Sequence, residues 1–425
     1  MSVVVHWSCM STPVSSDRAM PAAAIADTAP ATNPTVARPA ATFARRRLRL
    51  GILGVGTSVV LSVVWLTALL TGIVSIDADF RLTPFPLSRA GDAALLVLAV
   101  FAAHALLLGM IEYVGGAVEV RERPATGQWL ISWTRGVLVQ GALLGAFAFA
   151  AALAASLVGG MGVLSVVCGG ALTMLAVQGL IARSMAQMSA APANEEVGGR
   201  ALANGIRATS VRVIDVRDEA FVGGWIGLTT PQLWIPQRWT HAEHHDLLDI
   251  QLARRHAQFT SGARRRAIWR AVLWPAVGVA LAALVLPWSF THSAMWLALP
   301  AVSTLWTFVA VLVLPSFSRP AVYSADAAAA KRLGAARVVA AIRQLDVWQD
   351  DEPERSPGVE FIFHPVPSRN NRERALSRGT RATFGGGHQQ TRLTLFASLA
   401  GFGLLGRVVH CNIGRPSLWA VYPGD

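Results

Sequence analysis

Long runs of apolar residues, separated by short polar links, dominate the chain from about residue 50 onward. Four runs follow one another, and two more form a closely spaced pair further on. They cover residues 51–76, 93–117, 130–157, 160–182, 270–291 and 294–316. A helix needs about 20 such residues to cross the hydrocarbon core of a bilayer, and each run is long enough. The pattern predicts a mostly helical, multi-pass membrane protein with about six spans.

A seventh apolar segment near the C-terminus is shorter than the others. It covers residues 393–409, about 17 residues, which is borderline for a span. We expect a membrane-associated or buried helix at this place, followed by a short tail.

Polar residues gather in two blocks on either side of the paired runs. The first block covers residues 184–268 and the second covers 317–390, so a transmembrane hairpin at 269–316 divides what we expect to be one domain. Residues 49–183 are expected to form four membrane helices, and residues 391–425 an apolar helix and tail. The organisation is that of a polytopic membrane protein with an interrupted polar domain.

The first 48 residues differ from the rest of the chain. Residues 1–48 are rich in Ala, Pro, Ser and Thr and have no apolar period, which is typical of a disordered tail. A basic cluster directly precedes the first apolar run, at Arg45, Arg46, Arg47 and Arg49. Because cytoplasmic links carry an excess of Arg and Lys, we expect the N-terminus and the polar domain to be cytoplasmic.

The composition supports a membrane protein. Hydrophobic residues make up 53% of the chain and charged residues only 15%, whereas soluble domains carry about 25% charge. A net charge of +12 can indicate nucleic-acid binding, but the Arg residues flank the apolar runs, so we expect a lipid bilayer and no nucleic acid as partner. The cysteines at 9, 168 and 411 have no spacing that indicates a disulfide framework or a metal site.

Two ionisable residues interrupt the second apolar run. His104 and Glu112 are eight positions apart and therefore lie close to one helical face. Ionisable groups inside a membrane are candidates for function, which leaves a sensor or transporter built on the N-terminal spans as one interpretation. The other interpretation is a buried pair, or a position near the membrane interface.

The segment 239–256 has the pattern of an amphipathic helix that is rich in histidine. Thr240 is a suitable N-cap, and Glu243 three residues later completes a capping box. His241 and His245 have the i,i+4 spacing of a zinc helix, but no Glu follows His241 as that motif requires. We expect a solvated helix start here.

Several motifs in a fixed order carry a resemblance to a known family. They are AFVGG with the apolar segment after it, the Thr-capped helix, SRPAVYSAD directly after the hairpin, and FHPVPSRNNR, at 220–224, 232–236, 240–254, 318–326 and 363–372. In this order they resemble the HtpX-type and CaaX-prenyl-protease-type integral membrane zinc metallopeptidases, with their HExxH, SRxxExxAD and HPxxxxR segments. The resemblance covers about 184–380 and implies a zincin-like α+β domain in a bacterial inner membrane.

The residues at the metal-binding positions differ from those of the family. In the register of the resemblance, the first zinc His falls on Ile250, the catalytic Glu on Gln251 and the second zinc His on Arg254. The third ligand falls on Val322, and only Asp326, which supports the site in the family, is kept. Ile and Val have no lone pairs, Arg is always cationic, and Gln cannot take a proton from water. No HExxH occurs anywhere in the chain.

The sequence therefore predicts a degenerate family member, a pseudoprotease that acts as a scaffold or regulator without zinc or another cofactor. A vestigial cleft could still bind a peptide or membrane-protein partner by pairing with a strand edge. The candidate lining residues are Phe221, Val222, Leu233 and Trp234. An alternative is an active zinc metalloendopeptidase with unusual ligands, for which His241, His245 and His256 are the available donors.

Overall fold

The computed structural model describes most of the chain after the N-terminal tail. The described residues are 43–76, 88–120, 123–186, 188–216, 221–349, 351–379 and 386–420. They belong to one compact unit, Ala41–Asp425. Residues 1–42 of the predicted disordered tail lie outside the described residues.

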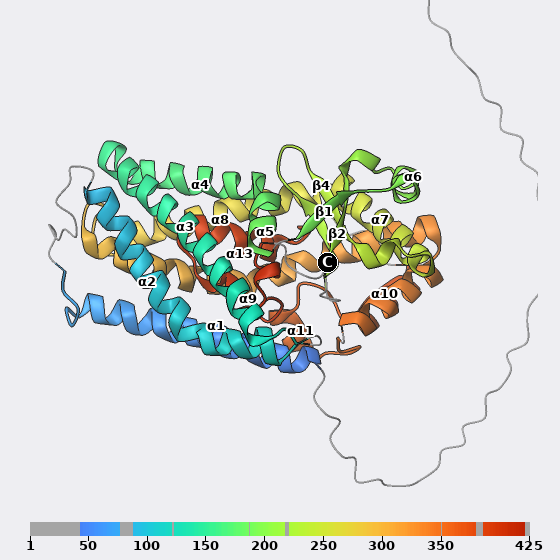
Figure 1. Ribbon diagram of the computed structural model, residues 1–425, viewed down its shortest axis with the longest axis horizontal. Helices are drawn as coiled ribbons and strands as arrows, with labels where there is room; N and C mark the ends of the chain where they lie inside the picture. The colour runs from blue at the N-terminus through green and yellow to red at the C-terminus, as the bar shows by residue number, and fades with distance from the viewer. Residues whose placement is uncertain are drawn as a thin grey trace, which may run out of the picture. The chain divides into compact units, whose positions relative to one another are not determined.

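Among the described residues, five helices are long and apolar enough to cross a membrane (Figure 1). They are α1 (Phe43–Leu70), α2 (Ser88–Tyr113), α3 (Thr126–Val158), α8 (Ala263–Val285) and α9 (Ser293–Leu333). The shorter helices α4 (Gly160–Ala176) and α5 (Gln178–Ala186) pass the same test together, but they are bent by 68° at their junction. The prediction of a mostly helical, multi-pass protein is confirmed, with the fourth span bent rather than straight.

The first helix begins earlier than the sequence suggests. Residues 43–48, predicted as part of a disordered tail, are the first turns of α1. Arg47 is 4% exposed, and its guanidinium donates to the main-chain oxygens of Gly115 at 2.7 Å and Ile413 at 3.1 Å. These contacts bury a residue of the basic cluster inside the protein and extend the helix toward the N-terminus.

The C-terminal apolar segment is buried, but only its first part is an α-helix. Helix α13 (Gln390–Ala397) packs against α8 and α9. The 3-10 turns η5 (Ser398–Gly401), η6 (Leu405–Arg407) and η7 (Pro416–Leu418) follow it. The single helix expected over 393–409 is therefore wrong, because the chain turns at Phe402, whose φ of 69° lies in the left-handed region.

A small mixed sheet forms part of the polar domain. Its strand order is β1-β2-β4-β3, with β2 and β4 parallel and the outer pairs antiparallel. The strands are β1 (Ser189–Pro192), β2 (Val211–Asp215), β3 (Gly224–Ile226) and β4 (Gln232–Pro236). Helix α6 (Glu195–Ala203) connects β1 to β2, and the Asn194 side chain caps it by accepting from the Val197 N–H at 2.9 Å.

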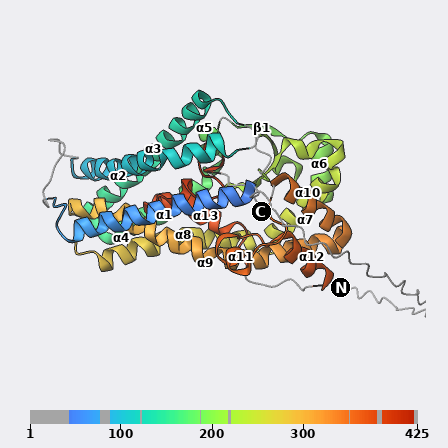
Figure 2. The same ribbon diagram turned by 90° about the horizontal axis from the view of Figure 1, so that it is seen from below.

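The remaining helices gather around the C-terminal part of α9 (Figure 2). They are α7 (His245–Thr260), α10 (Ala335–Gln349), α11 (Pro357–Phe363) and α12 (Arg369–Ser377). Two 3-10 turns, η3 (Gln237–Thr240) and η4 (Ala242–His244), precede α7. The predicted capping box is absent: the Thr240 hydroxyl donates to the Gln237 oxygen at 2.7 Å, and α7 begins five residues later at His245. Helix α9 crosses residue 317 without a break, so the hairpin and the second polar block share one helix.

Two glycines allow the C-terminal segment to lie directly against the membrane helices. Gly116 is in η1 (Val114–Val118), the π-helical turn that ends α2. A Cβ at this position would overlap the main-chain oxygen of Gly414 and the indole of Trp129. Gly414 has a φ of +67°, which glycine adopts without strain. The Trp129 indole also donates to the Gly414 oxygen at 2.9 Å.

We expect Gly116→Ala to destabilise the protein by about 1–3 kcal/mol, because overpacking a filled contact forces the backbone apart. The matched control is Gly56→Ala in α1, where a Cβ meets nothing within 4 Å; no loss is expected there, since Ala is the better helix former. Thermal unfolding in detergent, followed by tryptophan fluorescence, compares the two. Equal midpoints would contradict the close approach.

Candidate functional site

The five positions that the resemblance aligns with the metal centre come from α7 and α9, two helices that pack against each other. Ile250, Gln251 and Arg254 come from α7, and Val322 and Asp326 come from α9. All five are buried, with exposures between 1% and 3%. The i and i+4 spacing on α7 puts its first and last positions on one helical face, and the last of them, Arg254, reaches Asp326 on α9.

Two arginines hold the carboxylate of Asp326. The Arg254 Nε donates to Asp326 Oδ1 at 2.8 Å. From α12, Arg372 donates through Nε to Oδ2 at 2.8 Å and through Nη2 to Oδ1 at 2.9 Å. The Arg254 Nη1 also donates to Gln251 Oε1 at 2.9 Å. The Arg254 guanidinium therefore links Gln251 on its own helix to Asp326 on α9, and Arg372 joins α12 to the same carboxylate.

These side chains do not fit a zinc ion. Catalytic zinc needs three N, O or S ligands from the protein, and Ile250 and Val322 offer only hydrocarbon. Burial lowers the pKa of Arg254 to about 10, while the neighbouring Asp326 carboxylate opposes that shift. Arg254 consequently keeps its charge at neutral pH. A fixed guanidinium that contacts Gln251 and Asp326 would repel a second cation brought between them.

The three histidines named as substitute ligands contact different partners. His245 receives a hydrogen bond from Arg200 at 2.8 Å and lies 3.2 Å from Glu196. The His241 side chain is 57% exposed, and His256 packs against the loop between α6 and β2. Within the described ranges, no group of three or more His, Cys, Asp or Glu is placed to hold a metal.

The four residues named for a peptide cleft are part of the hydrophobic core. Phe221, Val222, Leu233 and Trp234 are 0–3% exposed. Leu233 and Trp234 belong to β4, which is paired on both sides and has no free edge. Ala220, the first residue of the same motif, lies outside the described residues. Phe221, Leu233 and Trp234 support the sheet from within, whereas Val222 also lines the cavity beside Arg254.

Side chains cover the outer edge of β3, where an added strand would pair. From α8, Arg264 donates to the main-chain oxygen of Trp225 at 2.9 Å. The side-chain amide of Gln389 donates to the oxygen of Gly223 at 3.4 Å. Strand addition uses such main-chain groups of an exposed edge, and here a guanidinium and an amide already use them.

The ionisable residues of the second apolar run belong to one buried network. The Arg407 Nε lies 3.2 Å from Glu112 Oε1, and the two side chains are 2% and 0% exposed. Arg407 Nη2 is also 3.5 Å from His104 Nδ1, and His104 Nε2 is 3.1 Å from the Ser58 hydroxyl. The Trp133 indole donates to Glu112. Glu112 is thus fully buried, and it pairs with Arg407 rather than with His104.

Sequence reasoning found His104 and Glu112 but missed Arg407, their shared partner. Arg407 lies inside the apolar segment 393–409, and ionisable residues are rare in such segments. Its position therefore marks it as a candidate for function in the same way as His104 and Glu112. The network fixes the C-terminal segment to α1, α2 and α3.

Comparisons with known proteins support the fold and not a specific activity. No protein-family model matches the chain, and no curated protein matches it in sequence. Its structure is similar to the crystal structure of S. mikatae Ste24p, with a TM-score of 0.58 and 13% sequence identity over 74% of this chain and 80% of that chain. At this identity the likeness concerns the fold. It confirms the predicted class, a mostly helical multi-pass protein with a small sheet.

We expect Arg254→Met to destabilise the protein by about 3–5 kcal/mol, because it leaves Asp326 buried with one partner fewer. Arg337→Met is the matched control. Its ion pair with Asp246, at 2.6 Å, has side chains 44% and 82% exposed, and such surface pairs contribute less than about 1 kcal/mol. Unfolding by SDS in mixed micelles measures both. Similar losses for the two variants would contradict a buried network around Asp326.

For the membrane network, we expect Arg407→Met and Glu112→Gln each to destabilise the protein. The loss for Arg407→Met should be about 3–5 kcal/mol, because it leaves the buried Glu112 carboxylate without its cation. The double variant should lose less than the sum of the two single losses, because it leaves neither charge uncompensated. The same unfolding assay completes the cycle. Strictly additive losses would show that the two side chains do not interact.

Proposed function

We propose that this chain is a pseudoprotease, a multi-pass membrane protein that acts as a scaffold or regulator by binding rather than by cleavage. Its fold is similar to that of Ste24p. The observation that carries the proposal is the Arg254 guanidinium, which links Gln251 to Asp326 at the position that the resemblance aligns with the second zinc ligand.

The side chains of the site support the loss of hydrolysis on two separate grounds. The amide of Gln251 is neutral and cannot take a proton from water, so the general-base contribution of about 10²–10⁴ has no source at this position. Ile250 and Val322 have no donor atom for the metal that would polarise the scissile carbonyl. Together the two losses oppose peptide hydrolysis by the route that the family resemblance implies.

The binding mode that we favour differs from strand addition. The edge of β3 is covered by Arg264 and Gln389, and Phe221 and Trp234 are buried. The cavity beside Gln251 and Arg254 is the binding feature that the site retains. We further propose that the polar domain faces the cytoplasm of a bacterial cell, since Arg residues are dense around 45–49 and 264–266, next to the spans.

The buried network around Arg407 does not favour a transporter. The cavity beside it has a volume of about 20 Å³, which is room for about one water molecule. Its polar groups hold the C-terminal segment in place, which is a structural role.

We expect the purified full-length protein to contain no stoichiometric zinc and to leave casein intact, because no set of donors at the site fits the metal. Elemental analysis and a cleavage assay in detergent measure the two properties. The proposal is overturned if zinc is stoichiometric and is lost on changing His241, His245 and His256 to Ala, but kept in the control His292→Ala.

A further inference from the structure

Charged residues mark the level at which the paired helices α8 and α9 leave the membrane. On α9, no charged residue occurs between Ser293 and Arg319. At 1.5 Å per residue this uncharged stretch is about 39 Å long, enough to cross a hydrocarbon core of about 30 Å. On α8, Arg270 is the last charged residue. Its guanidinium lies 5.5 Å from the ring centroid of Phe317, so the two helices reach this boundary at the same level.

An exposed apolar stripe runs along each of these helices up to the boundary. On α9, Val309, Val313 and Phe317 are exposed and are spaced four residues apart. On α8, Trp269 and Leu273 are exposed with the same spacing. Side chains four residues apart lie on one helical face, and aromatic residues are typical of the level where a span meets the headgroups. The two stripes are therefore the lipid-facing surface of the hairpin, with an aromatic residue at the edge of each.

Helix α11 of the polar domain is attached at this edge (Figure 2). Arg319 of α9 donates to the main-chain oxygens of Glu360 at 2.7 Å and His364 at 3.4 Å, and also to that of Phe361. The Arg319 guanidinium lies 5.1 Å from the ring centroid of Phe361. Since Arg319 is only two positions beyond Phe317, these contacts place the ring of Phe361 near the level of the boundary.

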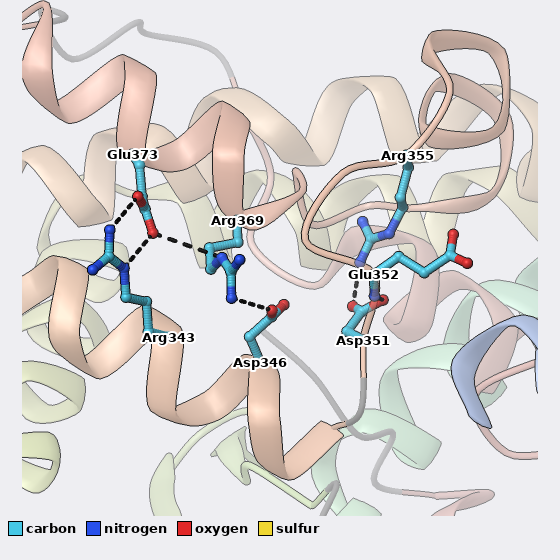
Figure 3. Close-up of polar contacts among 7 residues, drawn as sticks. All are labelled: Arg343, Asp346, Asp351, Glu352, Arg355, Arg369 and Glu373. Carbon is cyan, nitrogen blue, oxygen red and sulfur yellow. Dashed lines mark hydrogen bonds and ion pairs between the residues drawn. The ribbon is translucent and has the colours of Figure 1, made fainter. Parts of the chain in front are cut away.

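The chain on both sides of α11 is held by further contacts. Before the helix, Arg355 contacts Asp351 and also donates to the main-chain oxygen of Val366, beyond the helix, at 3.1 Å. After the helix, Arg369 lies 3.2 Å from Asp346 of α10 (Figure 3). The segment is thus closed at its base and attached to α10, so α11 has a fixed position on α9.

A third membrane helix contacts the same segment at the point where its own charges end. The Nε of Arg45 in α1 lies 2.5 Å from Glu352 Oε1. Arg45 belongs to the basic cluster that ends at Arg49, and from there to Leu70 the helix has no charged residue. The charge boundaries of α1 and α9 therefore agree on where the segment 351–364 lies, which is beside the headgroup layer.

We propose that α11 is an interfacial anchor of the polar domain, which lies in the headgroup layer with the Phe361 ring against the acyl chains of phospholipids. Phe361 is 54% exposed although its backbone is fixed. A single exposed apolar residue needs no explanation, but this one lies at the same level as Phe317 and Trp269 and continues a surface that faces lipid. Arg319 fits the same place, because long basic side chains lie along apolar surface with their charge among the headgroups.

The test is photo-crosslinking of the full-length protein in phosphatidylcholine vesicles. Phe361→p-benzoylphenylalanine places a ketone at the ring, which reacts on irradiation with C–H groups that it touches. An interfacial side chain of this kind reaches about 5–10 Å into the headgroup and acyl boundary. We expect an adduct with one phosphatidylcholine molecule, detected by mass spectrometry, in a yield similar to that of Val313→p-benzoylphenylalanine in the stripe of α9.

The matched control places the same group at an exposed residue of the polar domain away from the boundary. Leu202 of α6 is 69% exposed, and its neighbour Ala203 accepts a hydrogen bond from Arg332, which is about 20 Å beyond Arg319 along α9. Figure 1 shows α6 at the end of the polar domain away from the long helices. Leu202→p-benzoylphenylalanine should give no lipid adduct above that of a sample kept in the dark.

All three substituted side chains are exposed, so the variants should unfold in detergent at the same midpoint as the wild type. The inference is overturned if position 361 gives no lipid adduct, or if position 202 captures lipid equally well. A covalent dimer at position 361 in place of the lipid adduct would also overturn it, because the occupant of this surface would then be a second copy of the chain. The outcome does not depend on whether the protein is a pseudoprotease, which zinc content and casein cleavage decide separately.

Discussion

A carboxylate with no access to water must be paired, and in this protein that requirement organises the polar domain. Asp326 is 1% exposed and is held by Arg254 and Arg372. Removing charges from water costs several kcal/mol for each ion. The three charged side chains are therefore stable in the protein interior only if the hydrogen bonds between them are kept. The consequence is that α7, α9 and α12 are fixed relative to one another by charge as well as by apolar packing.

The same arrangement explains why these side chains do not fit a metal ion. A metal centre needs neutral or anionic donors around one cation, whereas here the cation is a side chain of the protein. With Arg254 in contact with Gln251 and Asp326, an additional cation between them is disfavoured. Beside Arg254, the Nε2 atom of Gln251 is a buried donor without an acceptor among the described residues.

The membrane part of the protein uses a related device. Arg407 pairs with Glu112, both fully buried, and so holds the C-terminal segment among the long helices. Gly116 and Gly414 allow the backbones of that segment and of α2 to come into direct contact. The segment also reaches the cavity, since His410 and Cys411 line it. One stretch of chain therefore connects the helix bundle to the site.

The sequence by itself determined the properties that depend on local composition. Apolar run length predicted the helices, because span length can be read from single segments. Only the tertiary structure decided which charges are paired. Arg254 and Asp326 are 72 positions apart, and nothing local distinguishes a paired arginine from a solvated one. Helix packing likewise buried Phe221 and Trp234 and broke the C-terminal run into α13 and tight turns, since both outcomes depend on which distant elements cover these residues.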